Sequence, residues 1–131
     1  RVSVSVLSLP RFQNERCIFD ISFILENDRL TNVSLLLAYW HMNEQDTSYC
    51  VRYTERSLIE LYGRPESDWI PRSDASLTER RVRWATNSSH ISLEHTQMRM
   101  AEIMAPTPRT TMSHSMSVGY MARDLSISNR F

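Results

Sequence analysis

The sequence contains no lysine, although lysine is among the commonest residues of globular proteins. All 15 basic residues are arginine, and 15 acidic residues balance them, so the formal net charge at pH 7 is zero. Four explanations are open: a skewed or overlapping coding sequence, engineering of lysine to arginine, avoidance of lysine modification, and selection for the bidentate bonds of guanidinium. We favour the compositional explanations over the functional ones.

Glycine is almost as scarce, with only Gly63 and Gly119 in 131 residues. Phosphate-binding loops and dinucleotide-binding fingerprints need several glycines at fixed spacing, and a nucleophile elbow needs glycines around a serine. These classes of enzyme are therefore excluded in their usual form. The longest apolar run, 33–40, is interrupted by Ser34 and is far shorter than the roughly 20 residues of a transmembrane helix, so we predict no membrane span.

Cysteine and histidine are too few to indicate a metal site or a disulfide framework. Cys17 and Cys50 could pair, but we expect free buried thiols, because one bridge is not the dense pattern of small disulfide scaffolds. His90 and His95 are five residues apart, which misses the four-residue spacing that places two ligands on one helical face. We predict no metal and no cofactor.

Much of the first half has strand patterns. Alternating valine and serine in 2–6 predict a half-buried strand, and the β-branched and aromatic segment 17–25 predicts a buried one. The apolar run 33–42 favours a strand over a helix, and the alternation in 48–54 predicts another strand. The period then changes at 55–62, where Leu58, Ile59 and Tyr62 share one helical face.

The second half is harder to interpret. Gly63, Pro65 and Pro71 predict a surface loop over 63–76. For 76–104 two interpretations compete: a hairpin of strands at 81–85 and 91–95, or two capped helices. We favour the hairpin, with Val82 and Trp84 facing inward and Arg81 and Arg83 outward.

The last segment differs in kind, because Pro106 and Pro108 open it and serine and threonine are frequent. We predict a single β-rich domain over 1–104 and an extended C-terminal arm over 105–131, with one strand at 116–121. The expected fold class is all-β, a sandwich or jelly-roll-like arrangement with one short helix, and α+β is the alternative.

Methionine is concentrated late in the chain, and flexible thioether side chains are common where one protein fits another. We therefore expect a non-enzymatic structural or assembly protein that forms a homo-oligomer or binds other structural subunits. A virus or phage particle would suit a compact coding sequence. The predicted partner interface consists of Met112, Met116, Tyr120 and Met121.

The first alternative is an RNA-binding accessory protein, because arginine alternates with aromatic residues in two regions. Its predicted contacts are Arg52, Arg56, Arg81, Arg83 and Trp84. The same alternation also describes an apolar core with a solvated face, and we favour that explanation of the pattern.

The second alternative is a small α+β enzyme whose pocket gathers His41, Tyr53 and Asp20. No catalytic motif supports this alternative, and the sequence predicts no catalytic residue otherwise.

Overall fold

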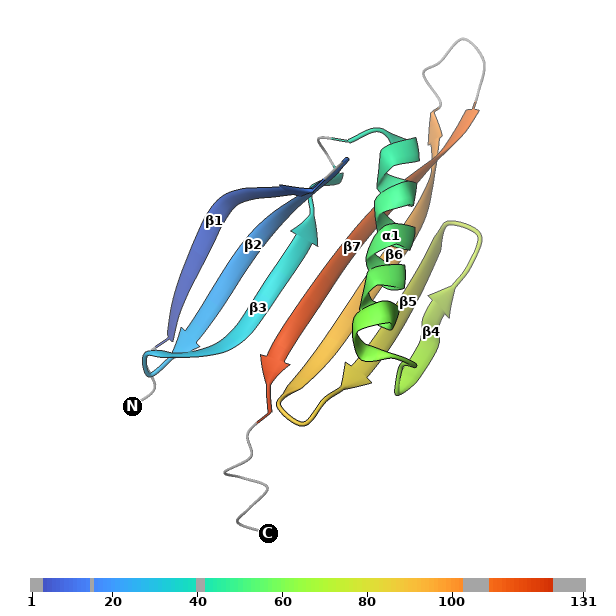
Figure 1. Ribbon diagram of the computed structural model, residues 1–131. Coiled ribbons are helices and arrows are strands. Elements are labelled where there is room, and N and C mark those ends of the chain that lie inside the picture. Colours follow the sequence, from blue (N-terminus) through green and yellow to red (C-terminus); the bar gives the residue numbers. More distant parts are fainter. Residues whose placement is uncertain (1–3, 15, 40–41, 103–108, 124–131) are drawn as a thin grey trace.

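The computed structural model describes residues 4–14, 16–39, 42–102 and 109–123. These residues form seven antiparallel strands and one α-helix (Figure 1). The elements are β1 (Val4–Asn14), β2 (Cys17–Glu26), β3 (Arg29–Leu37), α1 (Glu44–Tyr62), β4 (Ser67–Ser73), β5 (Leu77–Ala85), β6 (Ser89–Glu102) and β7 (Arg109–Ala122). The predicted all-β class with one helix is confirmed, but the sandwich or jelly-roll form is not, because the described strands make one sheet in the order β1-β2-β3-β7-β6-β5-β4.

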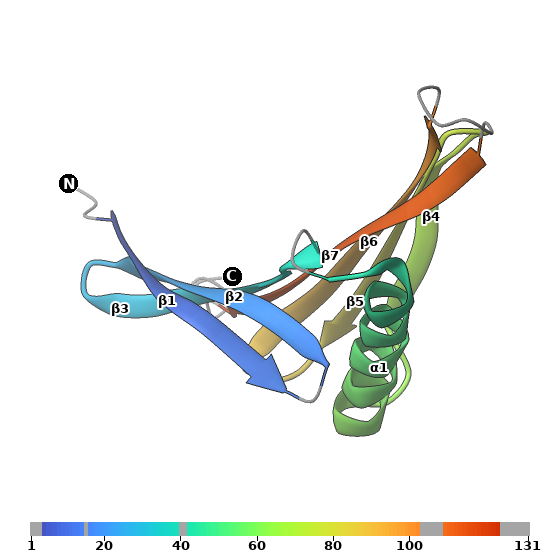
Figure 2. The same ribbon diagram turned by 90° about the horizontal axis from the view of Figure 1, so that it is seen from above.

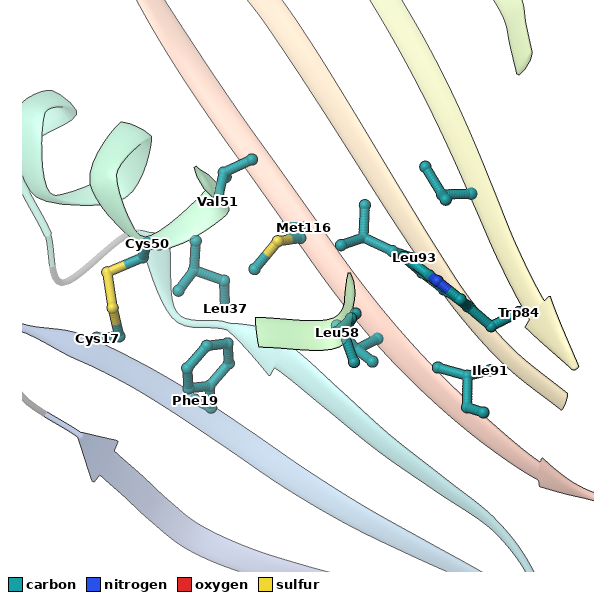
Figure 3. Packing of buried hydrophobic residues seen from close by; sticks show 12 residues of the cluster. Cys17, Phe19, Leu37, Cys50, Val51, Leu58, Trp84, Ile91, Leu93 and Met116 are labelled. Carbon is teal, nitrogen blue, oxygen red and sulfur yellow. A yellow bond between two sulfur atoms is a disulfide. The ribbon is translucent and has the colours of Figure 1, made fainter. Parts of the chain in front are cut away.

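The two faces of the sheet differ (Figure 2). Helix α1 packs on one face, which we call the helix face, and no described element covers the opposite face, which we call the open face. Alternate residues of β5, β6 and β7 point to the helix face and are buried there with side chains of α1. The core consists of Cys17, Phe19, Leu37, Cys50, Val51, Leu58, Val82, Trp84, Ile91, Leu93, Met116 and Val118 (Figure 3).

The sheet also divides along its width into two halves. The N-terminal half-sheet is β1–β3 and the C-terminal half-sheet is β4–β7, and only five residue pairs join them, between β3 and β7. By contrast, β6 and β7 are joined by fourteen pairs. A disulfide between Cys17 of β2 and Cys50 of α1, whose Cα atoms are 5.6 Å apart, adds a covalent link.

The disulfide corrects the prediction of free thiols. The cysteines are 33 residues apart in the sequence, and only the packing of α1 beside the start of β2 brings them together (Figure 3). Sequence spacing carries no information about that approach.

The helix is longer than predicted, and the strand expected at 48–54 is wrong. Residues Thr47, Cys50, Val51 and Leu58 face the core at helical spacing. Asn43 is a sequence signal for the start of this helix. It caps the helix by accepting a hydrogen bond from the Asp46 amide at 2.7 Å. Gly63, with φ of 79°, ends the helix as predicted.

The loop predicted over 63–76 contains a strand instead. Strand β4 pairs with β5 at one edge of the sheet, and nearly all of its side chains are exposed. An edge strand tolerates polar residues and proline, so its composition imitates a loop. The turn that follows is held by Asp74, whose carboxylate accepts hydrogen bonds from the Ser76 and Leu77 amides.

The hairpin predicted over 76–104 is confirmed as β5 and β6. Val82 and Trp84 are buried, while Arg81 and Arg83 are exposed on the open face, as expected. Strand β6 continues to Glu102, and residues 103–104 lie outside the described part of the chain.

Residues 109–122 are not an arm in the structure. They form β7, which is longer than the strand predicted at 116–121 and lies between β3 and β6 in the middle of the sheet. Residues 105–108 and 124–131 of the predicted arm fall outside the described residues.

Both edge strands are irregular at a proline. The pairing of β1 with β2 shifts register between Leu9 and Phe12, around Pro10. The pairing of β4 with β5 shifts between Trp69 and Arg72, around Pro71. Proline lacks the backbone N–H that a further strand would need as a donor.

Candidate functional site

The helix face contains an apolar cleft, which we call the helix-face cleft. Its volume is about 270 Å³, and it lies between α1 and strands of both half-sheets. Its lining comprises Phe19, Leu35, Tyr53, Thr54, Ser57, Leu58, Leu61, Val118 and Tyr120. Most of these side chains are apolar, so the cleft suits an apolar group better than a charged one.

The rim of the cleft exposes Leu61, of which 70% is accessible. Beyond α1, the N-terminal half-sheet continues the apolar surface. Ile21 pairs with Leu35 and Phe23 pairs with Val33, all on the side of the sheet that buries Phe19, and all four are partly exposed. The helix therefore leaves part of the apolar face uncovered.

The open face contains a second cavity, which we call the Gly119 hollow, also of about 270 Å³. In β7, Gly119 pairs with Ser34 on one side and Ser92 on the other, and it has no side chain to fill the space between them. The lining consists of Asn32, Arg83, His90, Ser92, Gly119, Tyr120 and Met121. No carboxylate of the described residues takes part in this lining.

A charged cluster joins α1 to the edge of the sheet. The Arg80 guanidinium donates hydrogen bonds from Nε and Nη2 to the two Asp68 oxygens, at 3.0 and 2.7 Å, and from Nη1 to Glu55 Oε2 at 2.9 Å. The hydrogen bond from Arg80 holds the pKa of Asp68 below its usual value. Both carboxylates are paired with the one guanidinium, so the arrangement is typical of a structural clamp between α1, β4 and β5.

Two histidines meet beside this cluster. His95 Nε2 and His114 Nδ1 are 3.0 Å apart, and the rings are stacked with centroids 5.2 Å apart. Burial, followed by the charges of His114 and Arg80, lowers the pKa of His95 to about 4, although Glu55 opposes the shift. Burial also lowers the pKa of His114. Both rings are therefore neutral at pH 7.

The residues predicted to bind RNA do not share one surface. Arg81 and Arg83 are exposed on the open face, whereas Arg52 and Arg56 are exposed on α1, on the other side of the sheet. The Trp84 ring is 1% exposed, and its indole N–H donates to the Gly63 carbonyl at 2.9 Å. Trp84 is therefore a core residue and offers no stacking surface.

The predicted partner interface is also divided. Met116 is 1% exposed and belongs to the core, so it cannot contact a partner in this conformation. Tyr120 is half-buried, with its ring edge against Tyr62 at a centroid distance of 6.4 Å. Met112 is partly buried, and Met121 is 50% exposed beside the Gly119 hollow.

The predicted enzyme pocket is not assembled from the residues that can be placed. Tyr53 lines the helix-face cleft. Asp20 lies between Phe19 and Ile21 in β2 and pairs with the exposed Leu36, so it points to the open face. His41 falls outside the described residues.

Within the described residues, no three histidine, cysteine or acidic side chains are placed to hold a metal ion together. No helix in the same part of the chain has the length and apolar character to cross a membrane. Comparison with protein-family models, curated proteins and solved structures gives no match. The helix-face cleft and the Gly119 hollow are therefore the features from which a function can be inferred.

Sequence reasoning missed both cavities and the histidine pair. Gly119 was visible as one of only two glycines, and a glycine inside a strand often marks a close approach or a gap. The signal could not be interpreted, however, until the sheet register placed Arg83 and Asn32 around it.

Proposed function

We propose that the protein is a non-enzymatic assembly subunit that associates with a second copy of itself through the helix face. The observation that carries this proposal is the helix-face cleft with the exposed Leu61 at its rim. A protruding apolar side chain beside an apolar cleft is self-complementary. In a two-fold pair, the Leu61 of each copy can enter the cleft of the other.

The surrounding surface supports association at this face. The partly exposed Ile21, Phe23 and Val33 extend the apolar area from the cleft onto the N-terminal half-sheet. Contiguous apolar surface of this kind marks interaction sites, because burying it releases about 25 cal/mol per Å². A particle built from many copies, such as that of a virus or phage, is the setting that the lysine-free composition favours.

Sedimentation equilibrium of the wild-type chain and two variants tests this proposal. Leu61→Glu places a charge at the rim and should weaken self-association by at least about tenfold, equivalent to roughly 1.4 kcal/mol. Met98→Glu is the matched control, because Met98 is 41% exposed but lies on β6, in register with Leu77 and Ser113 and away from the cleft. A monomeric wild-type chain, or equal losses in the two variants, would contradict the proposal.

Deletion of 105–131 is a poor test of assembly. It would remove β7, to which both β3 and β6 pair, and so would unfold the sheet whatever its association state.

A second candidate function is binding of single-stranded nucleic acid on the open face. One observation favours it: Arg81 pairs across β4 and β5 with Trp69, which is 40% exposed, so a guanidinium and an aromatic ring are adjacent on an uncovered sheet. The nearby Glu94, 4.0 Å from the Arg81 guanidinium, opposes phosphate binding.

Fluorescence anisotropy with single-stranded RNA at low salt distinguishes this second function. Changing both Arg81 and Arg83 to Ala should weaken binding strongly and lower its salt dependence, whereas changing Arg52 and Arg56 to Ala, on α1, should do neither. Equal effects of the two double variants would indicate only general charge attraction.

A further inference from the structure

The Gly119 hollow is formed by the absence of a side chain in the middle of the sheet. Gly119 lies in the central strand β7, between Ser34 and Ser92. A Cβ atom at this position would lie 3.2 Å from the Ser92 hydroxyl oxygen, which is tighter than ordinary van der Waals contact. Any larger residue would therefore crowd Ser92 and fill part of the hollow.

Hydrogen-bond donors surround the hollow from three strands. Arg83 of β5 is directly paired with Ser92 of β6, which is paired with Gly119, so the guanidinium and the hydroxyl lie in one row across the sheet. Asn32 and His90 pair with Met121 in the adjacent row. The lining thus combines a guanidinium, a hydroxyl, a carboxamide and an imidazole.

Arg83 is available to a ligand. Arg72, Arg80 and Arg81 in the same half-sheet each have a carboxylate within 4.0 Å, but no carboxylate of the described residues lies within that distance of Arg83. On β6, Glu94 lies 4.0 Å from Arg81, and on β4, Asp68 accepts hydrogen bonds from Arg80. A guanidinium without an acidic partner, at the wall of a cavity, can hold an oxyanion through two parallel hydrogen bonds.

We propose that the Gly119 hollow binds a small organic anion, whose carboxylate or phosphate group pairs with Arg83 and Ser92 and whose apolar body lies against Met121. Arg83 and Ser92 lie in the row of Gly119, where they can hold the anionic group, and the Met121 side chain lies in the adjacent row between Asn32 and His90. The volume of about 270 Å³ favours a ligand smaller than drug-sized molecules, whose pockets begin at about 300 Å³. The site is on the open face, so it is distinct from the helix-face cleft.

Isothermal titration calorimetry with four probes tests the site. Benzoate and phenyl phosphate carry a ring, and acetate and inorganic phosphate are their counterparts without one. We expect saturable binding of at least one ring-bearing probe, tighter than its counterpart, with amide shifts in NMR spectra at Gly119, Ser92 and Asn32. The tighter of benzoate and phenyl phosphate identifies the preferred anionic group.

Variants distinguish a specific binding site from general charge attraction. Arg83→Gln should weaken binding at least about tenfold, and Arg81→Gln, which removes a neighbouring charge from the same strand and face, should leave it within about twofold. Gly119→Ala should also weaken binding by filling the hollow, and circular dichroism checks that this variant is folded. Absence of saturable binding, equal losses for the two arginine variants, or wild-type binding by folded Gly119→Ala would overturn the proposal.

Discussion

The two half-sheets are stabilised in different ways. In the C-terminal half-sheet, strands β5, β6 and β7 bury six core side chains against α1, and Arg80 clamps the helix to β4. Among the side chains whose burial the structure describes, β2 and β3 contribute Cys17, Phe19 and Leu37 to that core, against six from the other half-sheet. Five residue pairs between β3 and β7 and one disulfide join the N-terminal half-sheet to the rest of the structure. A covalent bond here substitutes for packing that one helix cannot provide to a sheet this wide.

Removing the largest core side chain is the strongest test of the packed half. Trp84→Ala should lower the free energy of unfolding by about 3–5 kcal/mol, because it leaves a cavity and an unpaired Gly63 carbonyl. Trp69→Ala, at an exposed position on β4, should cost less than about 1 kcal/mol. Urea denaturation measures both, and similar losses would mean that the core is not centred on β5–β7.

Removing the disulfide should expose the difference between the halves directly. Changing Cys17 and Cys50 to Ser should cost about 3–4 kcal/mol, since the bond closes a loop across 33 residues. Hydrogen exchange should show a greater loss of protection in β2 and β3 than in β6. A reducing agent should reproduce the effect in the wild type and change nothing in the variant, and a uniform loss over both halves would contradict the comparison.

Acid should weaken the packed half through its histidine pair. The pKa of His95 is about 4 in the folded state, against an ordinary 6.5, so between these values the unfolded chain binds more protons. The contribution of His95 to the free energy of unfolding is therefore fully present above pH 6.5. It falls as the pH decreases towards 4, by about 2 kcal/mol after allowance for solvent screening.

Urea denaturation across pH 4–7 measures this loss. His95→Gln should flatten the profile, whereas His90→Gln, on the open face, should not. An unchanged slope in His95→Gln would show that another group, such as His114, determines the pH dependence.

The smallest expected effect concerns the clamp. Glu55→Gln keeps the shape of the side chain but removes its charge beside Arg80, which should cost about 1–2 kcal/mol. Glu60→Gln, at an exposed position on the same helix, is the control and should have almost no effect. Hydrogen exchange should locate the loss in α1 and β4, and a loss in β2 instead would contradict a local clamp.

Local patterns in the sequence predicted much of the sheet. Strand β2 and the β5–β6 hairpin were predicted because each depends on nearby residues, and Gly63 correctly marked the end of α1. The alternation in 48–54 was misleading, because the same residues form a helix in which Cys50 and Val51 are buried. The Asn43 cap was the stronger signal for that region.

Long-range features could not be predicted from these patterns. The position of β7 between β3 and β6, the Cys17–Cys50 bond and the contact of His95 with His114 all depend on strand order and register. The same holds for the candidate site. The sequence predicted Arg83 as part of a nucleic-acid platform with Trp84, but Trp84 is buried in the core. The residues that share the candidate site with Arg83 are Ser92 and Gly119, and only the sheet register brings them together.

The prolines of the two edge strands limit how copies can join. Pro10 in β1 and Pro71 in β4 each coincide with a shift of register, so neither edge offers an uninterrupted ladder of donors and acceptors to a further strand. Both ends of the sheet therefore disfavour extension into a continuous fibril by strand addition. The proposed assembly through the helix face agrees with these edges, because it joins copies by their faces and needs no strand addition.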